Sequence, residues 1–131
     1  MRIKAGVLLV VFSIALVLGA CSASPEEVVD AYYRYIIKGE FDVAYGLLCR
    51  DSKERFSAEE FETIWKHNLS INELVQFWIT GVGIEDDRAA VAVSLEADDG
   101  YSTFTIDAHV RLVKERNNWR IVLSEAFGKT R

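Results

Sequence analysis

The chain has 131 residues, half of them apolar, and a formal net charge of −5 at neutral pH. This length suits one ordinary domain, and the apolar fraction is high enough to form a hydrophobic core. The acidic balance, without clustered lysine or arginine, argues against nucleic acid as a partner, because phosphate binding needs cations in groups. With only two cysteines, a disulfide-rich fold is not expected either.

An export signal is predicted at the beginning of the sequence. Arg2 and Lys4 are followed by the uncharged run AGVLLVVFSIALVLGA, residues 5–20. A basic start and a short apolar run are typical of a secretory signal peptide. The run is shorter than the roughly 20 residues that cross a bilayer core, so an uncleaved membrane anchor is the less favoured alternative.

The signal ends in LGAC, residues 18–21, and this tetrapeptide resembles the lipobox of bacterial lipoproteins. The resemblance implies that the thiol of Cys21 receives a diacylglyceryl group and that the chain is cut just before it. The alternative is a simple cleavage site beside an unmodified thiol. Leu18 does not suit it, because such a site prefers a small residue at the third position before Cys21. We therefore expect a lipoprotein signal peptide over 1–20, a short tether over 21–23 and a single domain over 24–131.

Cleavage before Cys21 changes the charge and the cysteine content of what remains. Loss of Arg2 and Lys4 from the 15 basic residues leaves 13 against 20 acidic ones, a net charge of −7. Cys49 then has no intramolecular disulfide partner, and we expect it to be a buried, small apolar residue. Two acyl chains are enough for stable attachment, so the predicted protein is exported and anchored to a bacterial membrane, with the lipid bilayer as its partner.

Three helices are predicted after the tether. The stretch SPEE, residues 24–27, combines a serine cap, a proline at the first helical position and a capping-box glutamate, and its helix ends at Gly39. A second, shorter helix is predicted from Asp42, with apolar residues as far as Cys49. The stretch SAEE, residues 57–60, is another capping box and opens the third helix.

From Leu74 onward the apolar period changes from 3.6 to 2. Four strands are predicted, over residues 74–84, 88–96, 101–114 and 119–124. Short polar turns separate them, so the strands form an antiparallel meander. The helices must then cover one face of the sheet, which gives an α+β domain.

The helical stretch SPEEVVDAYYRYIIKGEFDVAYGLL and the hairpin HVRLVKERNNWRIV, residues 24–48 and 109–122, together resemble the nuclear transport factor 2-like, or cystatin-like, fold. More narrowly, the sequence is similar to uncharacterised bacterial lipoproteins with a lumazine-binding-like domain of this fold. The resemblance implies three N-terminal helices packed on one face of a curved four-stranded antiparallel sheet, a cone. That superfamily contains both enzymes and inert accessory domains, so the resemblance does not select a function.

Asp107 and His109 are the catalytic candidates. They lie two residues apart on the third predicted strand and could form a carboxylate-oriented imidazole, the start of a general-base site. The apolar residues that alternate with them, from Phe104 to Leu112, favour an outward position for both side chains, because burying unpaired polar groups is costly. A β-bulge, for which Gly81 and Gly83 of the first strand are candidate positions, would invert this parity.

A ligand site is predicted on the concave face of the sheet. Apolar side chains there, including Val75, Phe77 and Ile79 of the first strand, either bind a small apolar ligand or pack against the helices. Hydroxyl groups at the rim of such a site would come from Tyr32, Tyr33 or Tyr35. Trp78 is expected to be an exposed contact residue. No spacing suits a metal site and no glycine-rich phosphate loop is present, so no cofactor is expected.

Two functions fit this sequence. The first is a non-catalytic, membrane-tethered lipoprotein domain of the cell envelope that binds an envelope protein, a second copy in a homodimer, or a small apolar ligand. The second is a small isomerase or lyase with Asp107 or His109 as the base in the cone pocket. The first is favoured because the apolar face carries no catalytic set. Only Ser22 and Ala23 separate Cys21 from the first cap, so the domain is expected within roughly 10 Å of the membrane.

Overall fold

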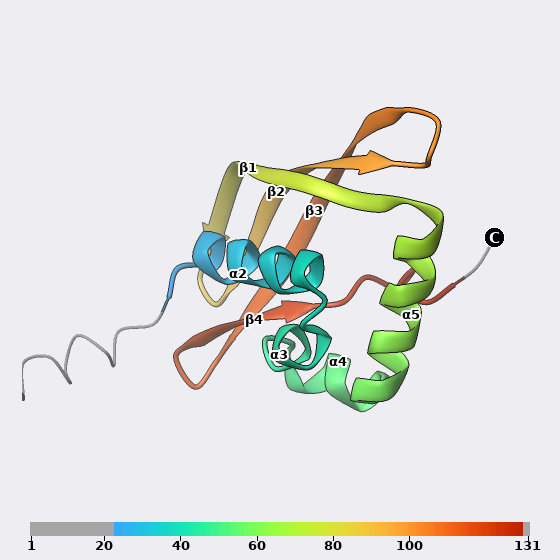
Figure 1. The fold of residues 1–131 in the computed structure, drawn as a ribbon. Helices are drawn as coiled ribbons and strands as arrows, with labels where there is room; N and C mark the ends of the chain where they lie inside the picture. The colour runs from blue at the N-terminus through green and yellow to red at the C-terminus, as the bar shows by residue number, and fades with distance from the viewer. Residues whose placement is uncertain (1–22, 130–131) are drawn as a thin grey trace, which may run out of the picture.

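The computed structural model describes residues 23–129, so Cys21 and the predicted signal lie outside the described residues. The described strands form one antiparallel sheet in the order β1-β2-β3-β4, and the helices lie on one face of it (Figure 1). The predicted fold class is therefore confirmed. No helix in residues 23–129 has the length and apolar character needed to cross a membrane. The elements in chain order are α2 (Pro25–Lys38), α3 (Phe41–Tyr45), α4 (Arg50–Arg55), α5 (Ala58–Ile71), β1 (Glu73–Glu85), β2 (Arg88–Asp98), β3 (Thr103–Glu115) and β4 (Asn118–Val122).

Both predicted capping boxes are present. Before α2, Ser24 Oγ accepts a hydrogen bond from the Glu27 N–H at 3.2 Å, and the Glu27 carboxylate accepts one from the Ser24 N–H at 2.8 Å. Ser57 and Glu60 make the same reciprocal pair before α5. Gly39 ends α2 in the left-handed conformation, with φ at 78°.

The second predicted helix is wrong in its extent. The helix α3 ends at Tyr45. Gly46 and Leu47 form a turn, Leu48 lies in a bridge, and Cys49 is extended instead of helical. Leu48 forms a parallel bridge with Ile121 of β4. The Cys49 N–H donates to the Ile121 carbonyl at 2.8 Å, and the Ile121 N–H donates to the Leu47 carbonyl at 2.9 Å. The backbone of this segment is thus satisfied by β4, and a separate short helix, α4, follows it.

The register of the sheet is irregular on one side only. Pairing of β1 with β2 shifts once between Leu74 and Gln76 and again between Ile79 and Gly81. Each shift leaves one residue of β1 out of the pairing, and one of them is Val75, which is 44% exposed instead of facing the core as expected. Pairing of β2 with β3 continues without a shift from Arg88 opposite Val113 to Asp98 opposite Thr103. The parity of β3 therefore stays as the sequence predicts.

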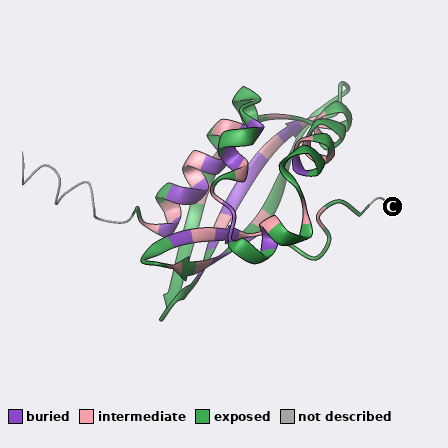
Figure 2. Cartoon of the chain, turned by 90° about the horizontal axis from the view of Figure 1, so that it is seen from below, coloured by how far each residue is buried: buried purple, intermediate pink, exposed green. Residues whose placement is uncertain are grey.

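The core lies between α2, α5 and the sheet. Figure 2 shows buried residues on the sides of these elements that face one another. Phe127, which follows β4, closes one end of the core: its ring centroid lies 5.7 Å from that of Phe61 and 5.3 Å from that of Phe56. Fully buried side chains come from both layers: Val29, Ile36, Leu48, Phe61, Val91, Val93, Leu112 and Ile121.

Ser52 is a polar group at the centre of this arrangement. It is fully buried at the middle of α4, and its hydroxyl oxygen accepts a hydrogen bond from the Leu123 N–H at 2.9 Å. The thiol of Cys49, the cap of α4, donates to the same oxygen at 3.3 Å. Cys49 is itself buried, as the sequence predicts. The Ser52 hydroxyl thus joins α4 to the end of β4.

Replacement of Ser52 by alanine is expected to lower the free energy of unfolding by about 1–3 kcal/mol, because the buried Leu123 N–H loses its acceptor. Urea denaturation followed by far-UV circular dichroism measures the change. Ser70→Ala is the matched control, since the Ser70 hydroxyl donates to the His67 carbonyl on the exposed surface. Equal, small decreases of the free energy of unfolding in both variants would contradict a structural role for the Ser52 hydroxyl.

Candidate functional site

A small hollow lies on the concave face of the sheet. Its volume is about 180 Å³, below the roughly 300–1,000 Å³ of most small-molecule sites. It lies where β4 leaves the edge of β3. The middle of the sheet is covered by the protein's own core side chains, whereas Phe104 and Ile106 of β3 stay partly exposed. The hollow is lined by Tyr32, Tyr33, Trp65, Ala108, His109, Val110, Arg111, Ile121, Val122, Leu123, Ser124 and Phe127.

The candidate tyrosines belong to the packed interior. Tyr32 is 3% exposed, and its hydroxyl oxygen accepts a hydrogen bond from Trp65 Nε1 at 3.1 Å, so it does not lie at an open rim. Tyr33 is also buried, with its ring 5.6 Å from that of Phe77, and Tyr35 packs against the core. Burial raises the pKa of Tyr33 to about 12 and that of Tyr32 further still. Both hydroxyls therefore stay protonated at neutral pH and are poor bases.

Asp107 and His109 lie on the outer face of the sheet, away from the helices. Both side chains are exposed, and they stand opposite Ser94 and Ala92 of β2. The Asp107 carboxylate accepts a hydrogen bond from the Ser94 hydroxyl at 2.9 Å. Among residues 23–129, no hydrogen bond or ion pair joins Asp107 to His109. The carboxylate thus orients a serine instead of the imidazole.

Trp78 shares the outer face with these residues. It is 44% exposed and stands opposite Ser94 in the register, so that Trp78, Ser94 and Asp107 form one row across three strands. The next row contains the small residues Gly81 and Ala92. A large aromatic ring next to small neighbours is available for contact, as expected from the sequence.

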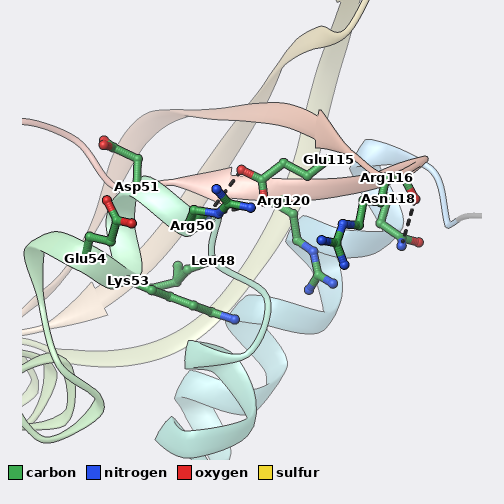
Figure 3. A pocket seen from close by; sticks show the side chains of 9 residues that line it. All are labelled: Leu48, Arg50, Asp51, Lys53, Glu54, Glu115, Arg116, Asn118 and Arg120. Carbon is green, nitrogen blue, oxygen red and sulfur yellow. Dashed lines mark hydrogen bonds between the residues drawn. The ribbon is translucent and has the colours of Figure 1, made fainter.

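A larger groove lies between α4 and the β3–β4 hairpin. It encloses about 900 Å³ and carries four cationic and three anionic side chains (Figure 3). Arg120 Nη1 and Lys53 Nζ both donate to the Gly46 carbonyl, at 2.8 and 3.4 Å. The groove is lined by Leu48, Arg50, Asp51, Lys53, Glu54, Glu115, Arg116, Asn118 and Arg120.

This groove corrects the expectation that no cations are clustered. Folding brings Arg50 and Lys53 of α4 beside Arg116 and Arg120 of the hairpin, which lie far away in the sequence. The charges are mixed, however, because Glu115 accepts hydrogen bonds from the Arg50 backbone N–H at 3.2 and 3.3 Å. Nearly balanced charge gives little net field, so the groove is a polar contact surface without the features of a phosphate site.

Metal ligands are not gathered anywhere in the described part of the chain. Over residues 23–129, no group of three or more histidine, cysteine, aspartate or glutamate side chains could hold a metal ion. The aspartates of the β2–β3 turn are used locally: Asp99 Oδ1 accepts hydrogen bonds from the N–H groups of Tyr101 and Ser102 at 2.8 and 3.0 Å. These bonds lower the pKa of Asp99. They stabilise a turn, which is the ordinary role of aspartate there.

Comparison with known proteins supports the fold. No family model matches the sequence, and no curated protein matches it. A SEC-C motif containing protein from Rhodopseudomonas palustris is similar in structure, with a TM-score of 0.68 and 15% identity over 84% of each chain. A Campylobacter jejuni protein named as an NTF2-like transpeptidase has a TM-score of 0.58 and 14% identity over 78% of this chain and 100% of its own.

A de novo designed NTF2 fold protein, NT-9, also aligns, with a TM-score of 0.45 and 14% identity over 82% of this chain and 92% of its own. At such identities a structural likeness shows a shared fold and nothing about activity. Together with the helices on one face of a four-stranded antiparallel sheet, the similarity to the Campylobacter jejuni protein shows that the described residues form an NTF2-like α+β domain.

Tyr33→Phe is expected to make the protein less sensitive to alkali. Above its ordinary pKa of about 10, the tyrosine of the unfolded chain ionises, whereas the folded protein holds the Tyr33 hydroxyl neutral up to about pH 12. The unfolded state therefore binds fewer protons, and stability falls as the pH rises through this window. Between about pH 10 and 12, the free energy of unfolding of the variant should fall by about 2 kcal/mol less than that of the wild type.

Urea denaturation at several alkaline pH values measures this difference. Tyr101→Phe is the control, because Tyr101 is 96% exposed, and it should lose stability as the wild type does. If the free energy of unfolding depended on pH identically in the wild type and in Tyr33→Phe, burial of the Tyr33 hydroxyl would not contribute to the alkaline loss of stability.

Proposed function

We propose that the chain is a membrane-tethered, non-catalytic binding domain of a bacterial cell envelope, which holds a protein partner near the membrane. The observation that carries this proposal is the division of the sheet into two faces. The concave face is filled by aromatic and aliphatic side chains of the protein itself. The outer face and the groove beside α4 present a half-exposed tryptophan and many charged groups to solvent.

A protein partner is favoured over a small apolar ligand. The hollow beneath the sheet has about 180 Å³, which accommodates one side chain but would enclose few whole ligands. Tyr32 and Trp65 close its inner wall through their hydrogen bond. Opening it further would require breaking this bond and separating packed rings, which costs free energy that a small ligand would have to supply.

The enzyme alternative finds little support among the described residues. A base in the cone pocket would have to point into the concave face, whereas Asp107 and His109 belong to the outward set of β3. His109 borders the hollow from β3, but Asp107 does not line it and is not bonded to His109. The titratable side chains that do line the hollow from the helices are Tyr32 and Tyr33, whose raised pKa values make them poor bases. We therefore propose recognition instead of an isomerase or lyase reaction.

The tether is proposed from the sequence. A diacylglyceryl group on Cys21 would hold the domain by a link of two residues, Ser22 and Ala23. The helix α2 begins on the side of the molecule where the β3–β4 hairpin turns, whereas the β2–β3 turn lies on the opposite side (Figure 1). With so short a tether, the side with the start of α2 and the β3–β4 hairpin would face the membrane. The side with the β2–β3 turn would face away from it.

Cys21→Ser is expected to release the protein from the membrane fraction, because the acyl acceptor is lost and the remaining chain has no other lipid attachment in this proposal. Cell fractionation with immunoblotting measures the distribution, and incorporation of labelled palmitate reports acylation. Cys49→Ser is the control and should stay acylated and membrane-bound. A Cys21→Ser protein that keeps both the label and the membrane location would contradict the tether.

The double variant Asp107→Asn and His109→Gln separates binding from catalysis. Both substitutions nearly keep the size of the side chain, and the amide oxygen introduced at position 107 can still accept the Ser94 hydrogen bond. We expect the variant to complement a deletion strain as well as the wild type does, since no base is needed. Complementation lost in a stably folded, membrane-bound variant, with circular dichroism as the folding check, would favour the enzyme.

A further inference from the structure

One edge of the sheet is open over more than half of a strand. β4 pairs with β3 only from Arg111 to Glu115. In the described residues, the part of β3 from Thr103 to Val110 has a strand neighbour on the β2 side and none on the other. Backbone groups along this edge are therefore available to a further strand.

The hydrogen-bonding pattern identifies these groups. The Lys114 N–H donates to the Asp87 carbonyl at 2.8 Å, so even-numbered residues of β3 direct their N–H and C=O groups toward β2. Direction alternates along a strand, and the odd-numbered residues direct theirs toward β4 or, beyond its end, toward the open edge. The open donors and acceptors belong to Thr103, Thr105, Asp107 and His109.

The other edge of the sheet is protected in a way that this one is not. β1 carries two register shifts, after Leu74 and after Ile79, and bulges of this kind disturb an edge so that it is a poor template for pairing. Pairing of β3 with β2 is regular throughout. The open part of β3, with the sequence TFTIDAHV, also consists mainly of residues that favour strands.

An apolar surface adjoins the open edge. On the concave face, Phe104 and Ile106 are 37% and 40% exposed because β4 does not extend far enough to cover them. The hollow of about 180 Å³ follows directly, with Ala108 on its β3 side and Trp65 and Phe127 opposite. A strand that continued the line of β4 would direct alternate side chains toward these residues.

We propose that the open edge of β3 binds an extended segment of a partner protein, which adds to the sheet in line with β4 and seats an apolar side chain in the hollow. This inference rests on the proposed binding function and names its site. Main-chain hydrogen bonds supply affinity in such strand addition, and pockets for alternate side chains supply specificity.

The chemistry of the segment follows from the surface. Its residues that face the concave side are apolar, because Phe104, Ile106 and Ala108 offer no polar partner. Its flanks are basic, since the chain after the predicted cleavage carries 13 basic and 20 acidic side chains. The open edge lies toward the β2–β3 turn, away from the start of α2, and thus faces away from the proposed tether (Figure 1).

A second copy of the chain fits this edge less well. Pairing of two β3 edges around a two-fold axis would turn the copies end to end, because a continuous antiparallel sheet has its axis perpendicular to the sheet. The starts of the two α2 helices would then point in opposite directions along the strands. A tether of two residues on each copy would have to bring the starts of both α2 helices to one membrane. Helix starts that point in opposite directions cannot both lie that close to it.

Amide hydrogen exchange measured by NMR tests the site on the lipidated protein in detergent micelles. The probe is a short peptide that alternates valine and threonine between terminal lysines. We expect the amides of Thr103, Thr105, Asp107 and His109 to exchange rapidly without the peptide and to be protected with it. A peptide methylated on alternate backbone nitrogens should not protect them. Protection at β1 or at the outer face alone would overturn the assignment.

Two substitutions probe the edge and the hollow separately. Thr105→Pro removes one open N–H while sparing the pairing with β2, and we expect at least about tenfold weaker binding of the peptide, or about 1.4 kcal/mol. Thr105→Val keeps the backbone donor and should bind as the wild type does. Ala108→Leu fills the hollow and should weaken binding even if Thr105→Pro fails to fold. Unchanged affinity in folded Thr105→Pro, or in Ala108→Leu, would overturn the proposal.

The remaining outcomes also decide between occupants. Protection of the same four amides that rises with protein concentration, without peptide, would assign the edge to a second copy and overturn the partner strand. Failure of the peptide to bind, while the double variant of Asp107 and His109 still complements the deletion strain, would overturn the edge site and leave the binding function standing. Loss of that complementation in a double variant that still binds the peptide as the wild type does would overturn the binding function itself.

Discussion

The attachment of the helical layer to the sheet depends on one short stretch, residues 47–52, which connects the end of α3 to the first turn of α4. Leu47 and Cys49 exchange backbone hydrogen bonds with Ile121, and the Ser52 hydroxyl binds the backbone of Leu123. These bonds fix α4 against β4 and fill the backbone requirements of an otherwise irregular connection. They also set the distance between α4 and the β3–β4 hairpin, and so the width of the charged groove. Side-chain hydrogen bonds from Arg55 to the Leu123 carbonyl and from Arg120 to the Gly46 carbonyl add to this attachment.

Local signals in the sequence predicted much of this fold. The serine, proline and glutamate residues of the two capping boxes mark the starts of α2 and α5, because each satisfies specific backbone groups within four residues. The polar turns between strands are equally local: Asp86, Arg116 and Asn117 adopt positive φ angles of 54°, 51° and 66°, as tight hairpins require. The alternation along β3 placed Asp107 and His109 on the outer face for the same reason.

Features that depend on distant residues could not be predicted. Leu47, Leu48 and Cys49 continue a helical apolar pattern, but their backbone leaves the helix and pairs with Ile121 of β4. The bulge between Ile79 and Gly81 lies beside a glycine that was a candidate, but the one after Leu74 has no such marker. The groove joins residues from α4 and the β3–β4 hairpin, which no local pattern connects.

The open edge is another consequence of distant packing. The sequence predicts a last strand as far as Ser124, and the structure ends β4 at Val122. The chain turns away from β3 there, and this turn sets how much of β3 is covered. The aromatic ring of Phe127, after the turn, packs on Phe61 and Trp65 of α5. It also forms one wall of the hollow, so that the edge and the hollow arise together from the same turn of the chain.

The bond between Leu123 and Ser52 joins residues 71 positions apart, and this separation has a kinetic consequence. Contacts between residues so distant in the sequence form slowly, because the chain must first close a long loop. The capped helices can form locally, yet they have no finished surface to pack on until β4 has joined the sheet. If the chain is exported as proposed, it would expose its aromatic residues until its last strand arrives. During that interval it would be a natural substrate for the chaperones of the compartment.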